Sequence, residues 1–387
     1  AEARIRNATV TATTGDVLVQ ALNSAQLTAT LDTEAESSGG SSFNAGTSLA
    51  INGLIATNAI QGGATAFVSG GSIVTQDSDA GDGNITIEAR NDAVLTATTV
   101  NATRSGATAI GVTIAFNSIG WAPQNALFNT VDALIGSPEI SDAYGDGSGA
   151  DAVAYLLDTT TSATGSLAVK AVAGTSLTAS ASNSTEAAAS VLAGRPEGLS
   201  FGGVISQNKV TSAALAFIDF AVDGVHPLSG EAVTPYTGAR TITAEDGVRV
   251  DGRDTAVFTA RVVLESKATA ETNDFQEASA KGFAFSVSLN DVRGGAEATI
   301  DNATVNSSAG AIVVEAIADA TLTAENNVAA ESGASGGTLL GGTSSTTINV
   351  IVATNVLTGG AMALVRDSSL TADLAVTVNA DNTAELT

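Results

Sequence analysis

The chain has 387 residues, of which 40 are acidic and 15 basic, and its formal net charge is −25. This balance excludes nucleic acid as a partner, because phosphate binding needs clustered Lys and Arg. The absence of cysteine excludes disulfides, thiol catalysis and thiolate metal sites, and no apolar run approaches the ~18 residues of a membrane-spanning helix. With 44% hydrophobic residues the chain is too apolar for a disordered tail, so we expect it to fold.

One short pattern occurs six times along the chain: apolar-x-apolar-x-Ala, then three residues, then Ala-x-Leu-x-Ala. The copies begin at residues 17, 85, 167, 248, 312 and 376, which are 68, 82, 81, 64 and 64 residues apart. Self-similarity at such a period predicts a repeat protein, in which each unit buries its apolar face only against its neighbours.

Strand signals dominate every unit in chain order. Apolar and polar residues alternate over short stretches rich in Val, Ile and Thr, and Gly, Asn and Asp mark the turns. The best helical candidate is one or two turns over 151–158, inside an insertion. Parallel stacking of such strands predicts an all-β, elongated parallel β-solenoid (β-helix), whose coils pair at ~4.8 Å.

The number of coils in each unit stays open from the sequence. A unit of 64 residues fits three coils of about 20 residues or one wide, flattened coil. The alternation through 30–51, centred on Gly39 and Gly40, also fits an antiparallel hairpin.

A second pattern, Asn-x-[Ile/Val/Leu]-x-x-x-Ala-x-Ala-x-[Ile/Val], recurs out of phase with the first. Its asparagines are Asn58, Asn117, Asn208, Asn290 and Asn355. Asparagine at an equivalent position of stacked coils predicts a structural ladder of side-chain amides. The alternative is that these residues occupy left-handed turns, which Asn tolerates.

The repeat is interrupted in its middle, at residues 120–240. The two longest units exceed the 64-residue units by 17 or 18 residues, and the single Trp, all three Tyr and the single His lie in this part: Trp121, Tyr144, Tyr155, His226 and Tyr236. Insertions at one corner of a solenoid project from one flank and often form its binding face. We hypothesise that these aromatic residues contact a glycan or a neighbouring protein, the alternative being that they pack in small cores of the insertions themselves.

Other chemistry has few candidate residues. Asp77, Asp79 and Asp82 place three carboxylates in a loop with glycine, as Ca²⁺ binding requires, although polar turn residues would look the same. His226 is a lone histidine beside proline, and the carboxylates are scattered singly. We therefore predict no catalytic residues, no enzyme activity and no required cofactor, with Ca²⁺ as a candidate ligand of the acidic loop.

The segments at 50–68 (AINGLIATNAIQGGATAFV), 301–324 (DNATVNSSAGAIVVEAIADATLTA) and 347–365 (TINVIVATNVLTGGAMALV) carry a family resemblance. They resemble the repeats of giant bacterial surface proteins, the filamentous haemagglutinin-like and leukotoxin-family filamentous adhesins. The resemblance covers essentially the whole chain. It implies a rigid stalk or filament at the cell surface, acting in adhesion or in a matrix, and it carries no catalytic residues.

We therefore expect residues 1–387 to form one continuous β-solenoid segment of a longer chain, with about six imperfect repeats and loop insertions on one flank. The expected role is a structural or adhesive segment of an extracellular, bacterial cell-surface filament protein. Its expected partners are adjoining repeats, neighbouring copies, and a surface glycan or matrix, without membrane insertion. The alternative is a carbohydrate-binding or polysaccharide-acting β-helix module that uses the insertion loops.

Overall fold

The computed structural model describes residues 1–387 except 40–46, 78–82, 121–149, 193, 273–276 and 337–341. The described residues form two parallel sheets that face each other, and they include no helix. Sheet B contains β2 (Val17–Ser37), β5 (Ile85–Ser105), β8 (Leu167–Val191), β11 (Gly247–Thr272), β14 (Ala311–Ser335) and β17 (Val376–Leu386).

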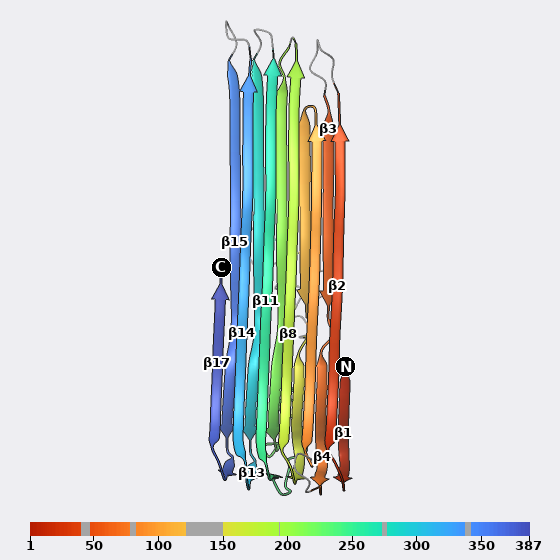
Figure 1. The fold of residues 1–387 in the computed structure, drawn as a ribbon, viewed down its shortest axis with the longest axis vertical. Helices are drawn as coiled ribbons and strands as arrows, with labels where there is room; N and C mark the ends of the chain where they lie inside the picture. The colour runs from red at the N-terminus through yellow and green to blue at the C-terminus, as the bar shows by residue number, and fades with distance from the viewer. Residues whose placement is uncertain (40–46, 78–82, 121–149, 193, 273–276, 337–341) are drawn as a thin grey trace.

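Sheet A contains two sets of strands. The first set follows the strands of sheet B along the chain and consists of β3 (Leu49–Ile60), β6 (Thr108–Ile119), β9 (Glu197–Asp219), β12 (Ala278–Asp301) and β15 (Thr343–Arg366), of which β9 extends to the level of β7 and pairs with it. The second set lies at the lower end in Figure 1 and consists of β1 (Glu2–Ala12), β4 (Ala64–Thr75), β7 (Ala152–Ala163), β10 (Thr241–Ala244), β13 (Thr304–Ser307) and β16 (Ser369–Ala372). The prediction of a helix over 151–158 is wrong, because this segment lies in β7.

Each repeat forms one wide, flattened coil. The chain runs along a strand of sheet B, reverses, and returns along sheet A at the same level of the stack (Figure 1). All strand pairings within the two sheets are parallel, and β2 pairs with β5 while β3 pairs with β6. The antiparallel hairpin considered for 30–51 is therefore wrong, since β2 and β3 lie in opposite sheets.

The repeated pattern sets the register of sheet B. Val17 pairs with Ile85, which pairs with Leu167, and the other copies follow in the same column up to Val376. The predicted parallel β-solenoid is thus confirmed. Because β11 has 26 residues, its strand is ~85 Å long, whereas six coils spaced ~4.8 Å apart span only ~24 Å. The long axis of the molecule therefore follows the strands (Figure 1).

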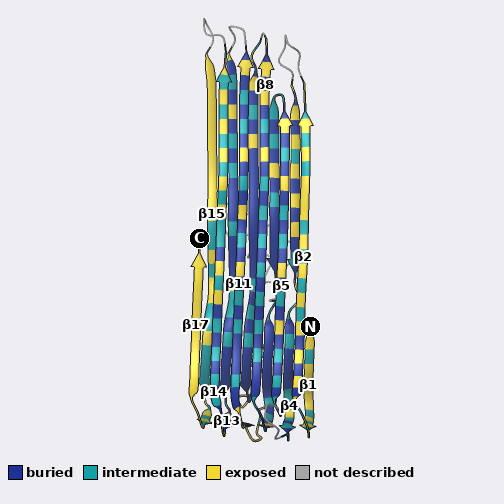
Figure 2. Cartoon of the chain, viewed as in Figure 1, coloured by how far each residue is buried: buried dark blue, intermediate teal, exposed yellow. Residues whose placement is uncertain are grey.

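The inner positions are buried in the middle coils and become exposed toward the last ones (Figure 2). Ile312 and Val314 in β14 are fully buried, whereas their partners Val376 and Val378 in β17 are 47% and 48% exposed. Each coil therefore depends on the next coil to cover its apolar side chains.

A ladder of amides runs through the interior, on the inner side of sheet A. The side-chain Nδ2 of each asparagine donates to the Oδ1 of the next, with distances of 3.0, 2.9, 2.9 and 2.8 Å along Asn58, Asn117, Asn208, Asn290 and Asn355. These residues lie within strands and none has a positive φ, so the interpretation as left-handed turn residues is wrong.

The same asparagines also join the two sheets. Nδ2 of Asn117 donates to the carbonyl of Thr178, and Nδ2 of Asn208 to the carbonyl of Thr259, both at 2.8 Å. Asn58 and Asn290 make the equivalent bonds to sheet B. One N–H of each of these four amides therefore bonds to the next asparagine of the ladder. The other N–H bonds to a carbonyl of sheet B and so sets the position of sheet A relative to sheet B along the strands.

Asp254 is an acidic exception in another inner column. Its register partners are Ala173 and Ala318, and the same column holds Asn23, Asn91 and Asn382. Asp254 is 7% exposed, and among the described residues its Oδ1 has no hydrogen-bond partner. Burial, with a smaller contribution from the charge of Asp151, raises the pKa of Asp254 to about 8.

We predict that Asn208→Ala lowers the stability of the fold by on the order of 3 kcal/mol, because it leaves the amide of Asn117, the Oδ1 of Asn290 and the carbonyl of Thr259 without their buried partners. The urea midpoint measures the change. Asn355→Ala is the control, since water reaches that end of the ladder. Equal losses in both variants would contradict the role of the ladder.

We predict that Asp254→Asn removes a pH dependence of stability. The folded carboxyl keeps its proton up to about pH 8, whereas the unfolded one releases it near its ordinary pKa of 3.8, so the native chain loses stability as the pH rises between these values. The variant should therefore melt at a higher temperature than the native chain at pH 8 and at nearly the same temperature at pH 4. A constant difference in melting temperature across this range would refute the assignment.

Candidate functional site

The described insertion at residues 220–240 folds over the outer face of sheet A. Its own turn is held by the bond from the Val233 amide to the Gly224 carbonyl (2.8 Å) and by an isolated antiparallel bridge between Val225 and Ala232. The amide of Tyr236 donates to the carbonyl of Ala221 (3.0 Å), which returns the insertion to its starting point.

An aromatic column lies under this insertion. Phe67, Tyr155 and Phe217 occupy the same outward position of three adjacent coils, and their rings stack at 4.7 Å with angles of 5° and 4° between the planes. The guanidinium of Arg6 covers the free side of Phe67 at 4.9 Å. Tyr155 is 5% exposed, and it belongs to a small apolar cluster that the insertion helps to form.

The predicted contact residues have different surroundings. The Tyr236 hydroxyl donates to the carbonyl of Ala239 (2.9 Å), and its ring packs on Phe220 at 5.0 Å. Tyr155 therefore packs in a small apolar cluster on sheet A, and Tyr236 packs against the main core between the sheets; their contact with a glycan or a neighbouring protein stays a prediction. Trp121 and Tyr144 lie outside the described residues.

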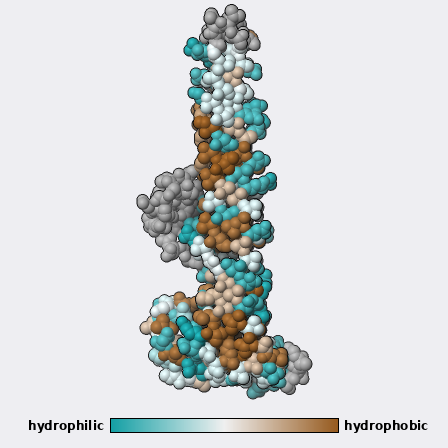
Figure 3. Space-filling view, turned by 90° about the vertical axis from the view of Figure 1, so that its left-hand side faces the viewer, coloured by the Kyte–Doolittle hydropathy of each residue, from teal (hydrophilic) through white to brown (hydrophobic). Residues whose placement is uncertain are grey.

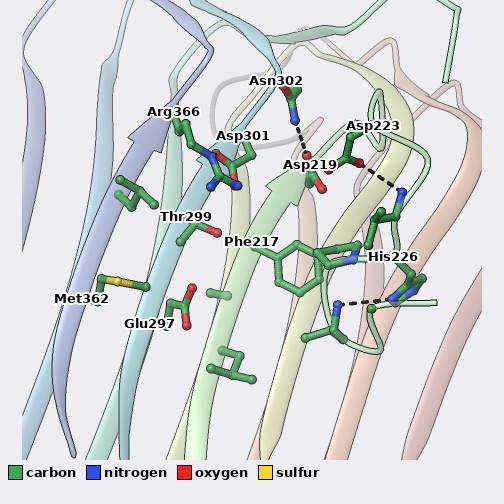
Figure 4. Close-up of a pocket in the computed structure, with 17 residues that line it drawn as sticks. Phe217, Asp219, Asp223, His226, Glu297, Thr299, Asp301, Asn302, Met362 and Arg366 are labelled. Carbon is green, nitrogen blue, oxygen red and sulfur yellow. Dashed lines mark hydrogen bonds and ion pairs between the residues drawn. The ribbon is translucent and has the colours of Figure 1, made fainter. Parts of the chain in front are cut away.

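A groove of about 510 Å³ opens between the insertion and the outer face of β9, β12 and β15 (Figure 4). One row of its floor consists of Phe217, Thr299 and Leu364, which are register partners in adjacent coils. The next row follows the same register, and it consists of Asp219, Asp301 and Arg366. The parallel stack therefore places an uncharged row, with Phe217 and Leu364 on either side of Thr299, beside a charged row.

The charges of the groove are partly compensated. Arg366 binds Asp301 through two bonds, from Nε to Oδ1 at 3.1 Å and from Nη2 to Oδ2 at 2.8 Å. Nδ2 of Asn302 donates to Oδ1 of Asp219 at 3.1 Å. Burial outweighs this bond and, with the nearby charge of Asp301, raises the pKa of Asp219 to about 6.

Two further side chains in the groove have no partner among the described residues. The carboxylate of Glu297 accepts no hydrogen bond there, and its pKa is raised by burial and by the charge of Asp301. Thr299 is 7% exposed, and within the described part of the chain its hydroxyl also makes no hydrogen bond. Both side chains can therefore bind the polar groups of a ligand.

His226 reaches the groove from the insertion (Figure 4). Its ring lies edge-on to Tyr155, with centroids 6.3 Å apart. Nδ1 accepts weak bonds from the amides of Leu228 and Ser229 at 3.3 and 3.4 Å. Since Nδ1 is an acceptor, the neutral ring carries its proton on Nε2, which makes that atom a hydrogen-bond donor.

The candidate calcium ligands are only partly described. Oδ2 of Asp77 accepts a bond from the Gly15 amide at 2.6 Å, so this carboxylate connects two turns at the base of adjacent coils. Asp79 and Asp82 lie outside the described residues. The residues that the structure describes contain no group of three His, Asp or Glu side chains that could hold a metal ion, and calcium binding stays a prediction.

Comparison of the chain with family models, with curated proteins and with solved structures gave no match. Over the described ranges, no helix has the length and hydropathy needed to cross a membrane.

The charged row of the groove was missed in the sequence, although a signal for it is present. The second repeated pattern ends in Ile or Val, and the residue directly after it is Asp219, Asp301 or Arg366 in three successive copies. That recurrence places the three side chains in one row. Only the structure shows that the insertion at 220–240 forms a wall beside them.

Proposed function

We propose that the chain is a non-enzymatic structural segment of an extracellular filament or stalk, which extends by stacking coil upon coil. The neighbouring coil belongs either to adjoining repeats of the same protein or to another copy. The observation that carries this proposal is the polarity of the asparagine ladder. Asn58 leaves its Oδ1 without a partner among the described residues, whereas Nδ2 of Asn355 at the other end donates to the carbonyls of Leu322 (3.1 Å) and Thr387 (2.8 Å).

The last coil supports the proposal because its inner side chains lack a cover. Figure 3 faces this end of the stack, and apolar surface extends along it. Val376, Val378 and Leu386 are 47%, 48% and 49% exposed, although they continue columns that are fully buried one coil earlier. A further coil of the same sequence pattern would bury them and pair the free edge of β15.

An extracellular bacterial location and a role in adhesion or matrix form the second part of the proposal. The absence of cysteine and the net charge of −25 suit an exported, highly soluble shaft whose copies repel each other except at complementary surfaces. The resemblance to filamentous adhesin repeats also supports a location at the cell surface and a role in adhesion. The length of each strand gives the stack a broad surface for attachment.

We predict that Thr28→Pro stops growth at the first coil. The amide of Val17 bonds to the carbonyl of Asn84, so in β2 the amides of alternate residues, including Thr28, face the free edge. Proline there removes no bond within the chain but blocks pairing with an incoming strand. Electron microscopy should show fibres of the native chain and of the control Thr28→Val, and no fibres for Thr28→Pro. Absence of fibres of the native chain at high concentration would contradict the proposal.

A second candidate function is glycan binding in the groove, and the unpartnered Glu297 and Thr299 beside Phe217 favour it. Carboxylates and hydroxyls bind sugar hydroxyls, and an apolar floor suits the sugar ring. We predict that binding on a glycan array, if the groove is the site, falls at least about tenfold in Glu297→Gln and in Thr299→Val. Glu265→Gln on the outer face of sheet B is the control. Binding that all three variants retain would exclude the groove.

A further inference from the structure

The outer face of sheet A carries large apolar side chains over five adjacent coils. The segments 51–55, 110–114, 201–205, 283–287 and 348–352 lie in register on β3, β6, β9, β12 and β15. Their first, third and fifth residues face outward, which gives 15 positions. Thirteen of these are Ile, Val or Phe, and the other two are glycine. We name these 15 positions the outer patch.

The residues that alternate with the outer patch face sheet B, and several of them are small, such as Gly111, Gly202 and Ala284. A Cβ at Gly202 would lie 2.6 Å from Cδ1 of Leu264, and one at Gly111 would lie 2.6 Å from Oδ1 of Asn183. At these two positions the sheets therefore approach too closely to admit a larger side chain. A register shift that turned Phe201 inward is sterically excluded, so the apolar side chains must face outward.

Much of the outer patch is accessible in the single chain, although Ile205 and Val287 are only 8% exposed. Phe201 and Val112, in inner coils, are 39% and 37% exposed, and Ile51 and Ile55 on the first coil are 63% and 58% exposed. A continuous apolar surface of this size on a soluble protein marks an interaction site.

Sheet B provides an internal comparison at the same level of the strands. Its outward positions carry ion pairs, such as Arg104 with Glu34 at 2.7 Å and Arg261 with Glu325 at 3.4 Å. Both sheets are built from the same coils, so the fold itself does not require an apolar outer face. The apolar side chains are specific to the sequence of sheet A.

We propose that the outer patch binds the outer patch of a second copy, so that two solenoids pack face to face through sheet A. Five strands at ~4.8 Å and five residues at ~3.3 Å give a projected area of roughly 400 Å² for each copy, and the pair covers roughly 800 Å², the size of a weak interface. The outer patch itself contains no charged residue, although the chain carries −25. Pairing through this face therefore brings together the uncharged surfaces and keeps the charged sheets B apart.

The insertion at 220–240 leaves room for this contact. It starts after Asp219, which is level with Asp301, and Asp301 lies 16 residues along β12 from Phe285 in the outer patch. This separation corresponds to ~54 Å. A lipid surface fits the outer patch less well, since the patch has no Trp, Tyr or Lys and the net charge opposes anionic lipids.

Sedimentation equilibrium of the chain in the Thr28→Pro background tests the proposal, because that change blocks stacking at the ends without touching the outer patch. We expect a dimer that tightens when NaCl rises from about 50 to about 500 mM, as screening weakens the repulsion between the two chains. Phe285→Lys should raise the dimer Kd about 100-fold or more, since it buries two unpaired charges. Val263→Lys, outward on sheet B in the same coil, is the matched control and should leave Kd unchanged.

Chemical cross-linking gives a second readout that does not depend on a destabilising change. The chain has no cysteine, and a Cβ at Gly203, in the middle of the outer patch, meets its neighbours only at 3.7 Å or more. A short bismaleimide should join Gly203→Cys chains into dimers and leave Val263→Cys chains single. A monomeric chain, equal cross-linking of both variants, or binding to phosphatidylcholine vesicles by a monomer would overturn the proposal. Loss of fibres with the dimer intact would overturn only the stacking function.

Discussion

Every side chain in this fold lies ~4.8 Å from its counterpart in the next coil, and this constraint determines which residues each column can hold. Amides suit it, because each can donate to the next in the same direction, as Asn117 and Asn208 do. Flat rings suit it as well, and Tyr155 stacks between Phe67 and Phe217. Buried carboxylates in adjacent coils would repel each other at this distance. Asp254 accordingly has alanine on both sides in its column.

The second constraint is the thin space between the two sheets. In the upper half of the molecule, small residues such as Gly111 and Gly202 permit close approach, and polar groups such as Asn183 bridge the gap by bonding to the Gly111 carbonyl at 2.8 Å. Opposite such positions the interior has no room for a larger side chain, and neighbouring large residues such as Phe201 face outward. Sheet A thus acquires an apolar outer face, while the outer face of sheet B keeps ion pairs and hydroxyls.

The sequence predicted those parts of the fold that repeat. The columns of sheet B and the asparagine ladder recur in every unit, so that spacing alone places them. The shape of a coil could not be predicted, because alternation is the same in a narrow coil and a wide one. Residues 151–158 seemed helical because both faces of β7 are covered, which removes the alternation. The groove escaped prediction because Asp219 and Glu297 meet His226 only where the insertion folds back.

The orientation of the strands determines how the stack carries force. Strands run across the direction of stacking, so a pull along the stack loads the hydrogen bonds between two coils along their own length. Between the third and fourth coils, β8 and β11 share 25 register pairs, and β9 and β12 share 23. These bonds must stretch together, whereas a force applied at one corner opens them one after another. A filament of such coils would resist an even pull strongly and would peel from an edge.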